Sequence, residues 1–102
     1  MFHMAIMDIQ VSPRRKDTVS VSDAVAEAHR VIEKSGMKHV LHPMGTCIEG
    51  PAAQLYSLAA EIHAALAAMG YERIGIQIKI DERLDKQQSM SDKVRRVNEL
   101  LN

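Results

Sequence analysis

The chain has 102 residues, of which 46% are hydrophobic, and its 13 basic side chains balance 13 acidic ones. This length and composition predict one folded domain, residues 1–102, with a core of its own. The neutral charge and the scarcity of aromatic residues argue against a nucleic-acid partner. No apolar run approaches the ~20 residues of a membrane span.

The number of cysteines indicates the redox state of the compartment in which the protein works. The chain has a single cysteine, Cys47, which cannot form an internal disulfide and therefore favours a reducing environment. The N-terminal residues also lack the pattern of a secretory signal. We therefore expect a cytoplasmic protein.

The first elements are a strand and a helix. Residues 4–12 alternate in a way that is typical of a strand. Ser20 and Asp23 have the spacing of a capping box, and apolar residues follow them at helical spacing. A helix is therefore expected from about Val21 to Ser35.

A hairpin follows this helix. Residues 37–42 and 46–49 are short strand candidates. Pro43 suits the second position of a β-turn and Gly45 suits its end. The two strands should therefore pair with each other.

The second helix is expected to start at Pro51, because proline at the first helical position loses only an amide that has no partner there. An apolar stripe continues to Met69. Gly36 and Gly70 follow the two helices and suit the position just after a helix end.

The last elements are a strand and a short helix. In residues 74–81 four isoleucines alternate with other residues, which predicts a strand with one apolar face. Ser91 is a candidate cap for the last helix. Val94, Val97 and Leu101 line one side of it.

The element order β-α-β-β-α-β with an added C-terminal helix predicts an α+β, ferredoxin-like fold. Its antiparallel sheet should carry both main helices on one face. The other face should hold polar side chains, with Cys47 and Glu49 among them if Ile48 points to the helices. The expected polar residues are Asp8, Gln10, Ser12, Gln77, Lys79 and Asp81.

The last strand should form an edge of the sheet, and an uncovered edge without proline favours pairing with another chain. We therefore expect a homo-oligomer that covers the edge, the polar face or both. The alternative is a monomer whose polar face is solvated.

Several short motifs occur along the chain, and the most specific is Pro43-Met-Gly-Thr-Cys-Ile-Glu-Gly50. The others are Ser20-Val-Ser22, Val25-Ala-Glu-Ala28, Ser35-Gly-Met-Lys38, Ile78-Lys-Ile-Asp81 and Ser91-Asp-Lys-Val94. With these motifs, which span nearly the whole chain in the expected order, the chain resembles the small, single-domain members of the YkoF-like thiamine-binding family. One departure is the charged segment 14–17, where comparable members tend to have small residues.

The resemblance implies a ferredoxin-like homotetramer that binds thiamine, or its hydroxymethylpyrimidine half, at subunit interfaces. It implies a binding protein that is not an enzyme and that uses no cofactor apart from this ligand. The alternatives from other classes are a small enzyme and an assembly module that both use the polar face.

The chemistry of the ligand selects candidate residues. Glu49 can accept from the exocyclic amine of the pyrimidine or pair with a protonated ring nitrogen. Thr46, Ser12 and Gln10 can donate and accept hydrogen bonds, and Met44 can supply an adaptable apolar wall. Each has a plainer alternative. Glu49, for example, could pair with Lys79 or lie at the N-terminus of the second helix.

Other chemistries have weaker support. His39 and His42 are three apart on a strand and should point to opposite faces, which argues against a zinc site that joins them to Cys47, and no metal is expected. Cys47 could act as a nucleophile only with a base and a lowered thiol pKa. His42 could approach it across the turn, but no third group is evident.

Overall fold

The computed structural model describes residues 3–14 and 22–102. Ser20 of the predicted capping box and residues 15–17 of the charged segment lie outside these ranges. The described elements, in chain order, are β1 (Ala5–Val11), α1 (Ser22–Ser35), β2 (Lys38–His42), β3 (Gly45–Gly50), α2 (Ala52–Ala68), β4 (Ile76–Glu82) and α3 (Met90–Leu101).

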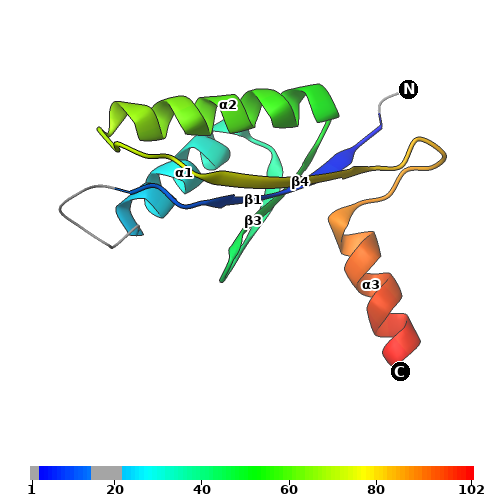
Figure 1. Ribbon diagram of the computed structural model, residues 1–102. Coiled ribbons are helices and arrows are strands. Elements are labelled where there is room, and N and C mark those ends of the chain that lie inside the picture. The colour runs from blue at the N-terminus through cyan, green and yellow to red at the C-terminus, as the bar shows by residue number, and fades with distance from the viewer. Residues whose placement is uncertain (1–2, 15–21) are drawn as a thin grey trace.

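The sheet has four strands in the order β2-β3-β1-β4, and each neighbouring pair is antiparallel. Helices α1 and α2 lie on the same face of this sheet (Figure 1). The predicted α+β, ferredoxin-like architecture with an added helix is confirmed. β4 is an edge strand, as expected, and β3 lies between two others.

The face under α1 and α2, called the covered face below, holds the hydrophobic core. Met7 and Ile48 are directly opposite each other on β1 and β3, and both side chains are fully buried. Alternation along each strand sends these residues to one face, where they meet the apolar stripe of α2. The buried residues of that stripe are Leu55, Leu58, Ala59, Ile62 and Leu66.

The ends of the two main helices follow the glycine pattern. Gly36 and Gly70 have φ angles of 72° and 86°, a region that residues with a Cβ rarely adopt, so the prediction for both is confirmed. The start of α2 differs by one position. Pro51 is its N-cap, with φ −61° and ψ 139°, and Ala52 is the first helical residue.

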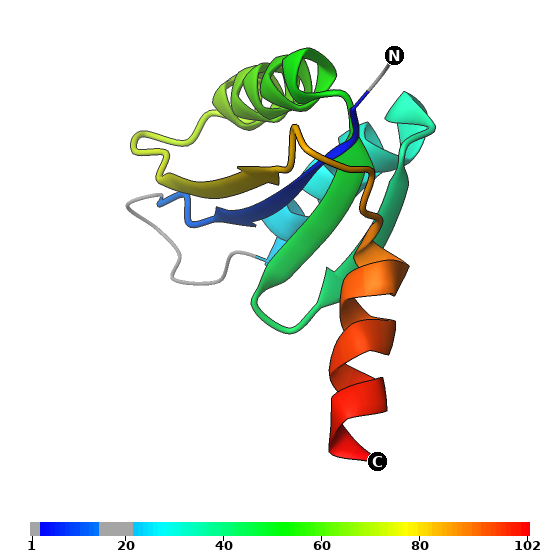
Figure 2. The same ribbon diagram turned by 90° about the vertical axis from the view of Figure 1, so that its right-hand side faces the viewer.

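Helix α3 begins two residues earlier than the sequence suggests. Its cap is Ser89 and not Ser91, because the Ser89 side chain accepts from the Asp92 amide while the Asp92 side chain accepts from the Ser89 amide. This reciprocal pair satisfies two amides that Ser91 would leave without a side-chain partner. From this cap α3 projects away from the sheet on the side opposite α2 (Figures 1 and 2).

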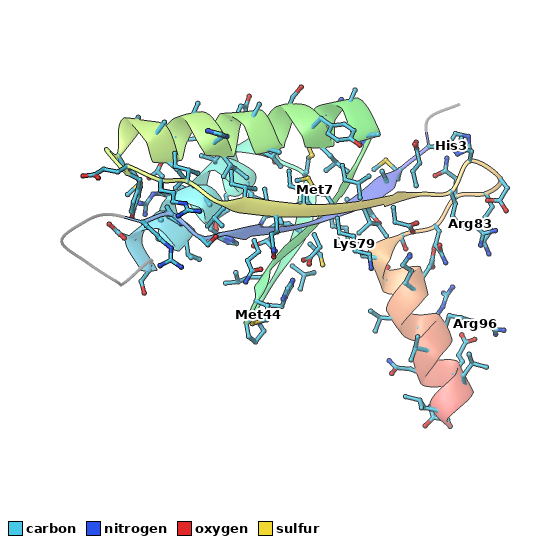
Figure 3. The ribbon with its side chains drawn as sticks, viewed as in Figure 1. His3, Met7, Met44, Lys79, Arg83 and Arg96 are labelled. Carbon is cyan, nitrogen blue, oxygen red and sulfur yellow. The ribbon has the colours of Figure 1, made fainter. Side chains whose placement is uncertain are left out.

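The apolar side of α3 faces outward. Val94, Val97, Leu100 and Leu101 are each more than half exposed. Figure 3 shows the side chains of α3 together with those on the face of the sheet that α1 and α2 do not cover. Among the described residues, none of the helices combines the length and the hydropathy that crossing a membrane would require.

Candidate functional site

The face of the sheet that α1 and α2 leave uncovered, called the open face below, carries the polar residues of the strands. Asp8 lies directly opposite Cys47 on one side and Lys79 on the other, and Gln10 lies opposite Gln77. Ile48 points to the helices and is fully buried. The predicted composition of this face is therefore confirmed for Asp8, Gln10, Cys47, Glu49, Gln77, Lys79 and Asp81.

Three strands bring Asp8, His42 and Cys47 together on the open face. His42 Nε2 lies 2.7 Å from Asp8 Oδ1, and the Cys47 thiol donates to the same oxygen at 3.4 Å. Burial, and then the hydrogen bond and the negative charge of Asp8, raise the pKa of Cys47. The thiol is therefore held in its protonated, poorly nucleophilic form.

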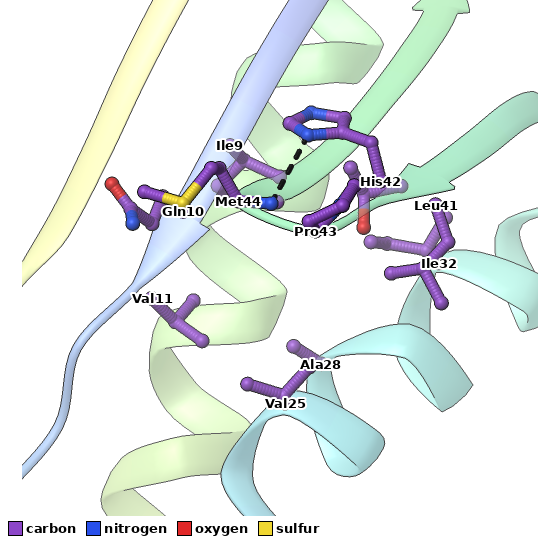
Figure 4. Close-up of a pocket in the computed structure, with 12 residues that line it drawn as sticks. Ile9, Gln10, Val11, Val25, Ala28, Ile32, Leu41, His42, Pro43 and Met44 are labelled. Carbon is purple, nitrogen blue, oxygen red and sulfur yellow. Dashed lines mark hydrogen bonds between the residues drawn. The ribbon is translucent and has the colours of Figure 1, made fainter. Parts of the chain in front are cut away.

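A hollow of about 180 Å³ opens where the β2–β3 hairpin meets the end of β1 and α1. Figure 4 shows Val25 and Ala28 of α1 facing Val11 of β1 across it. Its lining residues are Ile9, Gln10, Val11, Val25, Ala28, Ile32, Leu41, His42, Pro43, Met44, Gly45 and Thr46. We call this the hairpin hollow.

The hairpin hollow unites three of the five residues predicted to bind the ligand: Gln10, Met44 and Thr46. Thr46 is buried on the covered face, whereas Met44 is 66% exposed at the turn. The close approach of the hairpin to β1 requires Gly45, because a Cβ there would lie 2.4 Å from the carbonyl oxygen of Ile9. Tertiary packing thus builds this hollow around the turn.

Glu49 lies elsewhere. It is 7% exposed, and its Oε1 accepts a hydrogen bond of 2.7 Å from the backbone amide of Met90. That amide belongs to the first turn of α3, where a carboxylate is favoured by the free amides and the helix dipole. Both plainer alternatives for Glu49 were therefore wrong. Lys79 lies opposite Asp8 in the register of β1 and β4. The helix whose amide donates to Glu49 is α3, not α2.

Thr46 and Glu49, the two leading candidates, lie on opposite faces of β3, so one subunit does not bring them together. Glu49 instead borders a shallow depression with Met4 and residues 87–89 and 92. Ser12 is outside both depressions. Its amide and its hydroxyl each donate to the carbonyl oxygen of Gly75, at 2.7 Å and 3.3 Å.

Some residues of the hairpin hollow were not predicted to bind the ligand. His42 borders it, and its Nδ1 accepts from the Met44 amide at 3.3 Å. From the sequence, His42 was a candidate only as a metal ligand or as a base for Cys47. Val25 and Ile32 form an apolar wall from α1, and this contact between distant segments had no local signal.

Comparison with known proteins agrees with this fold. A family model described as thiamine-binding protein matches residues 7–98. The protein YqgV of Bacillus subtilis, classed as UPF0045, is 35% identical over 102 residues, covering 96% of this chain and 98% of its own.

The chain is also similar to solved structures of other proteins. Hypothetical protein MJ1052 from Methanocaldococcus jannaschii has a TM-score of 0.85 at 28% identity, with 96% of this chain and 99% of that chain covered. TM0486 from Thermotoga maritima, whose name refers to thiamine biosynthesis/salvage, has a TM-score of 0.81 at 22% identity and 92% and 98% coverage. This second likeness speaks for the fold alone. The match over residues 7–98 establishes that the chain belongs to the thiamine-binding protein family, as its motifs indicated.

Proposed function

We propose that this protein binds thiamine or its hydroxymethylpyrimidine half, without catalysing a reaction, in a site completed between subunits of a homotetramer. The observation that carries the proposal is the hairpin hollow, which places Gln10, Thr46 and Met44 around one space in a member of a thiamine-binding family.

The hollow has the chemistry that a substituted pyrimidine needs. Gln10 and Thr46 border the hollow from opposite faces of the sheet. The Gln10 amide and the Thr46 hydroxyl each offer a donor and an acceptor for the ring nitrogens and the exocyclic amine. Met44 supplies a flexible, polarizable wall, and Val25 and Ile32 supply an apolar one. This combination of a mainly apolar lining with a few polar groups is typical of small-molecule sites.

A cationic thiazolium ring would be served from the open face. Asp8 is 45% exposed there, next to His42, which borders the hollow. A carboxylate beside a residue that borders the hollow would favour the cation over a neutral analogue. Thiamine is therefore expected to bind more tightly than the pyrimidine half alone.

The size of the hollow favours a site between subunits. Its 180 Å³ is below the ~300 Å³ at which drug-sized ligand pockets begin. Val40 on the open face and Val97 on α3 are both 55% exposed. A second copy would bury such side chains and complete the walls, and Glu49 or Ser12 of that copy could then join the site.

The raised pKa of Cys47 supports binding without catalysis, because it disfavours the thiolate that a nucleophile needs. The same unpaired cysteine supports a location in the cytoplasm. The ligand-free alternative, an assembly module, predicts the same oligomer with an empty hollow.

Calorimetric titration with thiamine and with hydroxymethylpyrimidine tests the proposal. Gln10→Leu should weaken binding at least ~10-fold, the equivalent of one hydrogen bond. Gln77→Leu is the matched control, because Gln77 faces Gln10 on β4 but does not line the hollow, and it should bind like the wild type.

Three further outcomes are informative. No heat and no change in melting temperature at millimolar ligand would overturn the proposal, since a ligand of the native state must stabilise it. Conversion of the ligand would replace binding by catalysis. Glu49→Gln should leave the oligomer size unchanged, and weaker binding in this variant would add Glu49 to the site.

A further inference from the structure

A second cluster of metal-ligating side chains lies between α1 and β2, away from the hairpin hollow. His29 and Glu33 are four residues apart on α1 and therefore share one side of that helix. Their nearest side-chain atoms, His29 Nε2 and Glu33 Oε1, are 3.1 Å apart. His39 of β2 lies opposite the buried Ile48, so it points to the helix side of the sheet.

The three side chains converge on one space. One ligand atom from each of His29, Glu33 and His39 lies within 4.8 Å of the others. The two imidazole rings meet edge to face, with centroids 5.2 Å apart and an interplanar angle of 75°. Neighbouring ligands on a tetrahedral zinc ion lie about 3.3 Å apart, given Zn–N bonds of ~2.0 Å. The His29–Glu33 separation is already close to this value.

His39 is arranged as a metal-binding histidine. Its Nδ1 lies 2.8 Å from the carbonyl oxygen of Met37. A carbonyl only accepts, so Nδ1 carries the proton and Nε2 keeps its lone pair. A backbone carbonyl that fixes the tautomer in this way is the usual second partner of a histidine bound to a metal.

The two ring nitrogens of His29 differ. Nε2 lies 3.1 Å from Glu33 Oε1 and is the atom that would bind the ion. Nδ1 is buried and has no hydrogen-bond partner among the residues that the structure describes, so it is not a ligand atom in this arrangement. Glu33, at 61% side-chain exposure, is free to adjust toward an ion.

We propose that His29, Glu33 and His39 bind a divalent transition-metal ion, with water in the remaining position. Two imidazoles and a carboxylate suit Zn²⁺ and its neighbours in the series. None of the three residues lines the hairpin hollow, so this metal site does not depend on the proposed binding of thiamine.

The other group of possible ligands, Asp8, His42 and Cys47, is less suited to a metal. His42 Nδ1 accepts a hydrogen bond from the Met44 amide, so Nε2 carries the ring proton and donates a hydrogen bond to Asp8. The histidine thus has no lone pair left for an ion. This group serves as the internal control, because a metal bound there would contact a sulfur atom.

The test uses the untagged full chain, stripped with a chelator and titrated with Zn²⁺ by calorimetry and with Co²⁺ by absorption. One ion should bind per chain. His39→Gln and Glu33→Gln should each weaken binding by at least ~10-fold, the lower end of what losing only an outer partner costs. His63→Gln, an exposed histidine on α2, should change nothing.

The cobalt spectrum identifies the ligands. Nitrogen and oxygen ligands give visible bands without a thiolate-to-cobalt charge-transfer band. A charge-transfer band that Cys47→Ser abolishes would overturn the proposal, and so would wild-type affinity in His39→Gln. If His39→Gln fails to fold by circular dichroism, Glu33→Gln decides alone, because its exposed side chain is not part of the core.

Discussion

The two faces of the sheet share the same four strands but differ in how their side chains are satisfied. On the covered face, Met7 and Ile48 are fully buried against α1 and α2. On the open face, Asp8 and His42 pair with each other while Val40 stays 55% exposed. The first face is complete within one subunit, and the second has polar groups paired locally and apolar groups still in contact with solvent.

This difference separates folding from binding. Burial of apolar area stabilises the subunit through the covered face, where cavities are costly. Apart from Glu49, whose carboxylate accepts from the first turn of α3, the open face contributes little to that stability and is available for a partner. Substitutions on the two faces should therefore have different consequences, and four comparisons test this division.

The largest contrast is expected between Ile48→Ala and Val40→Ala, on adjacent strands. Ile48→Ala should lower the free energy of unfolding by ~2–5 kcal/mol, because it leaves a cavity in the core. Val40→Ala should change it by at most ~0.5 kcal/mol in the separated subunit. Urea unfolding at several protein concentrations measures both. A large cost for Val40→Ala that grows with concentration would show that another copy buries this residue.

Glu49 should matter next, because it is an open-face residue that is buried under the start of α3. Glu49→Ala leaves the Met90 amide without its acceptor and should cost ~1–3 kcal/mol. Glu49→Gln keeps an acceptor oxygen and should cost less. Urea unfolding and amide exchange within α3 measure the difference. Equal stability of the two variants would contradict the role of the Met90 hydrogen bond.

The cap of α3 should have a smaller and more local effect. Ser89→Ala removes the side-chain acceptor of the Asp92 amide and should destabilise the helix by about 1 kcal/mol. Ser91→Ala is the control, since Ser91 is not the cap. The two variants should differ in the helical signal and in amide exchange of α3. The reverse order would return the cap to Ser91.

The smallest effect concerns the open-face thiol. Asp8 raises the pKa of Cys47 through a hydrogen bond and through its charge, although burial is the larger cause. Asp8→Asn should therefore lower that pKa without restoring its ordinary value. More thiolate is then present at a given pH, and alkylation by iodoacetamide should become faster. A rate profile against pH measures the shift, and a slower reaction in Asp8→Asn would contradict the assignment.

Much of the candidate site could be expected from local pattern. Alternation in β1 and β4 placed Asp8, Gln10 and Gln77 on one face, because a strand repeats every two residues whatever its neighbours are. The position of Gly45 at the end of the β-turn could also be predicted from its spacing to Pro43. The partner of Glu49 was not, because Met90 is 41 residues away, and no local pattern encodes which helix returns to a strand.

The sequence by itself determined the order of the elements, their apolar faces and the glycines that end α1 and α2, because these follow from spacing and from backbone conformation. Tertiary structure alone decided that Thr46 and Glu49 separate, that Gln10 and Met44 meet at the hairpin, and that His29 and His39 approach each other. These outcomes depend on how strands pair and where helices cross them, which are long-range contacts between residues with no signal in their own segments.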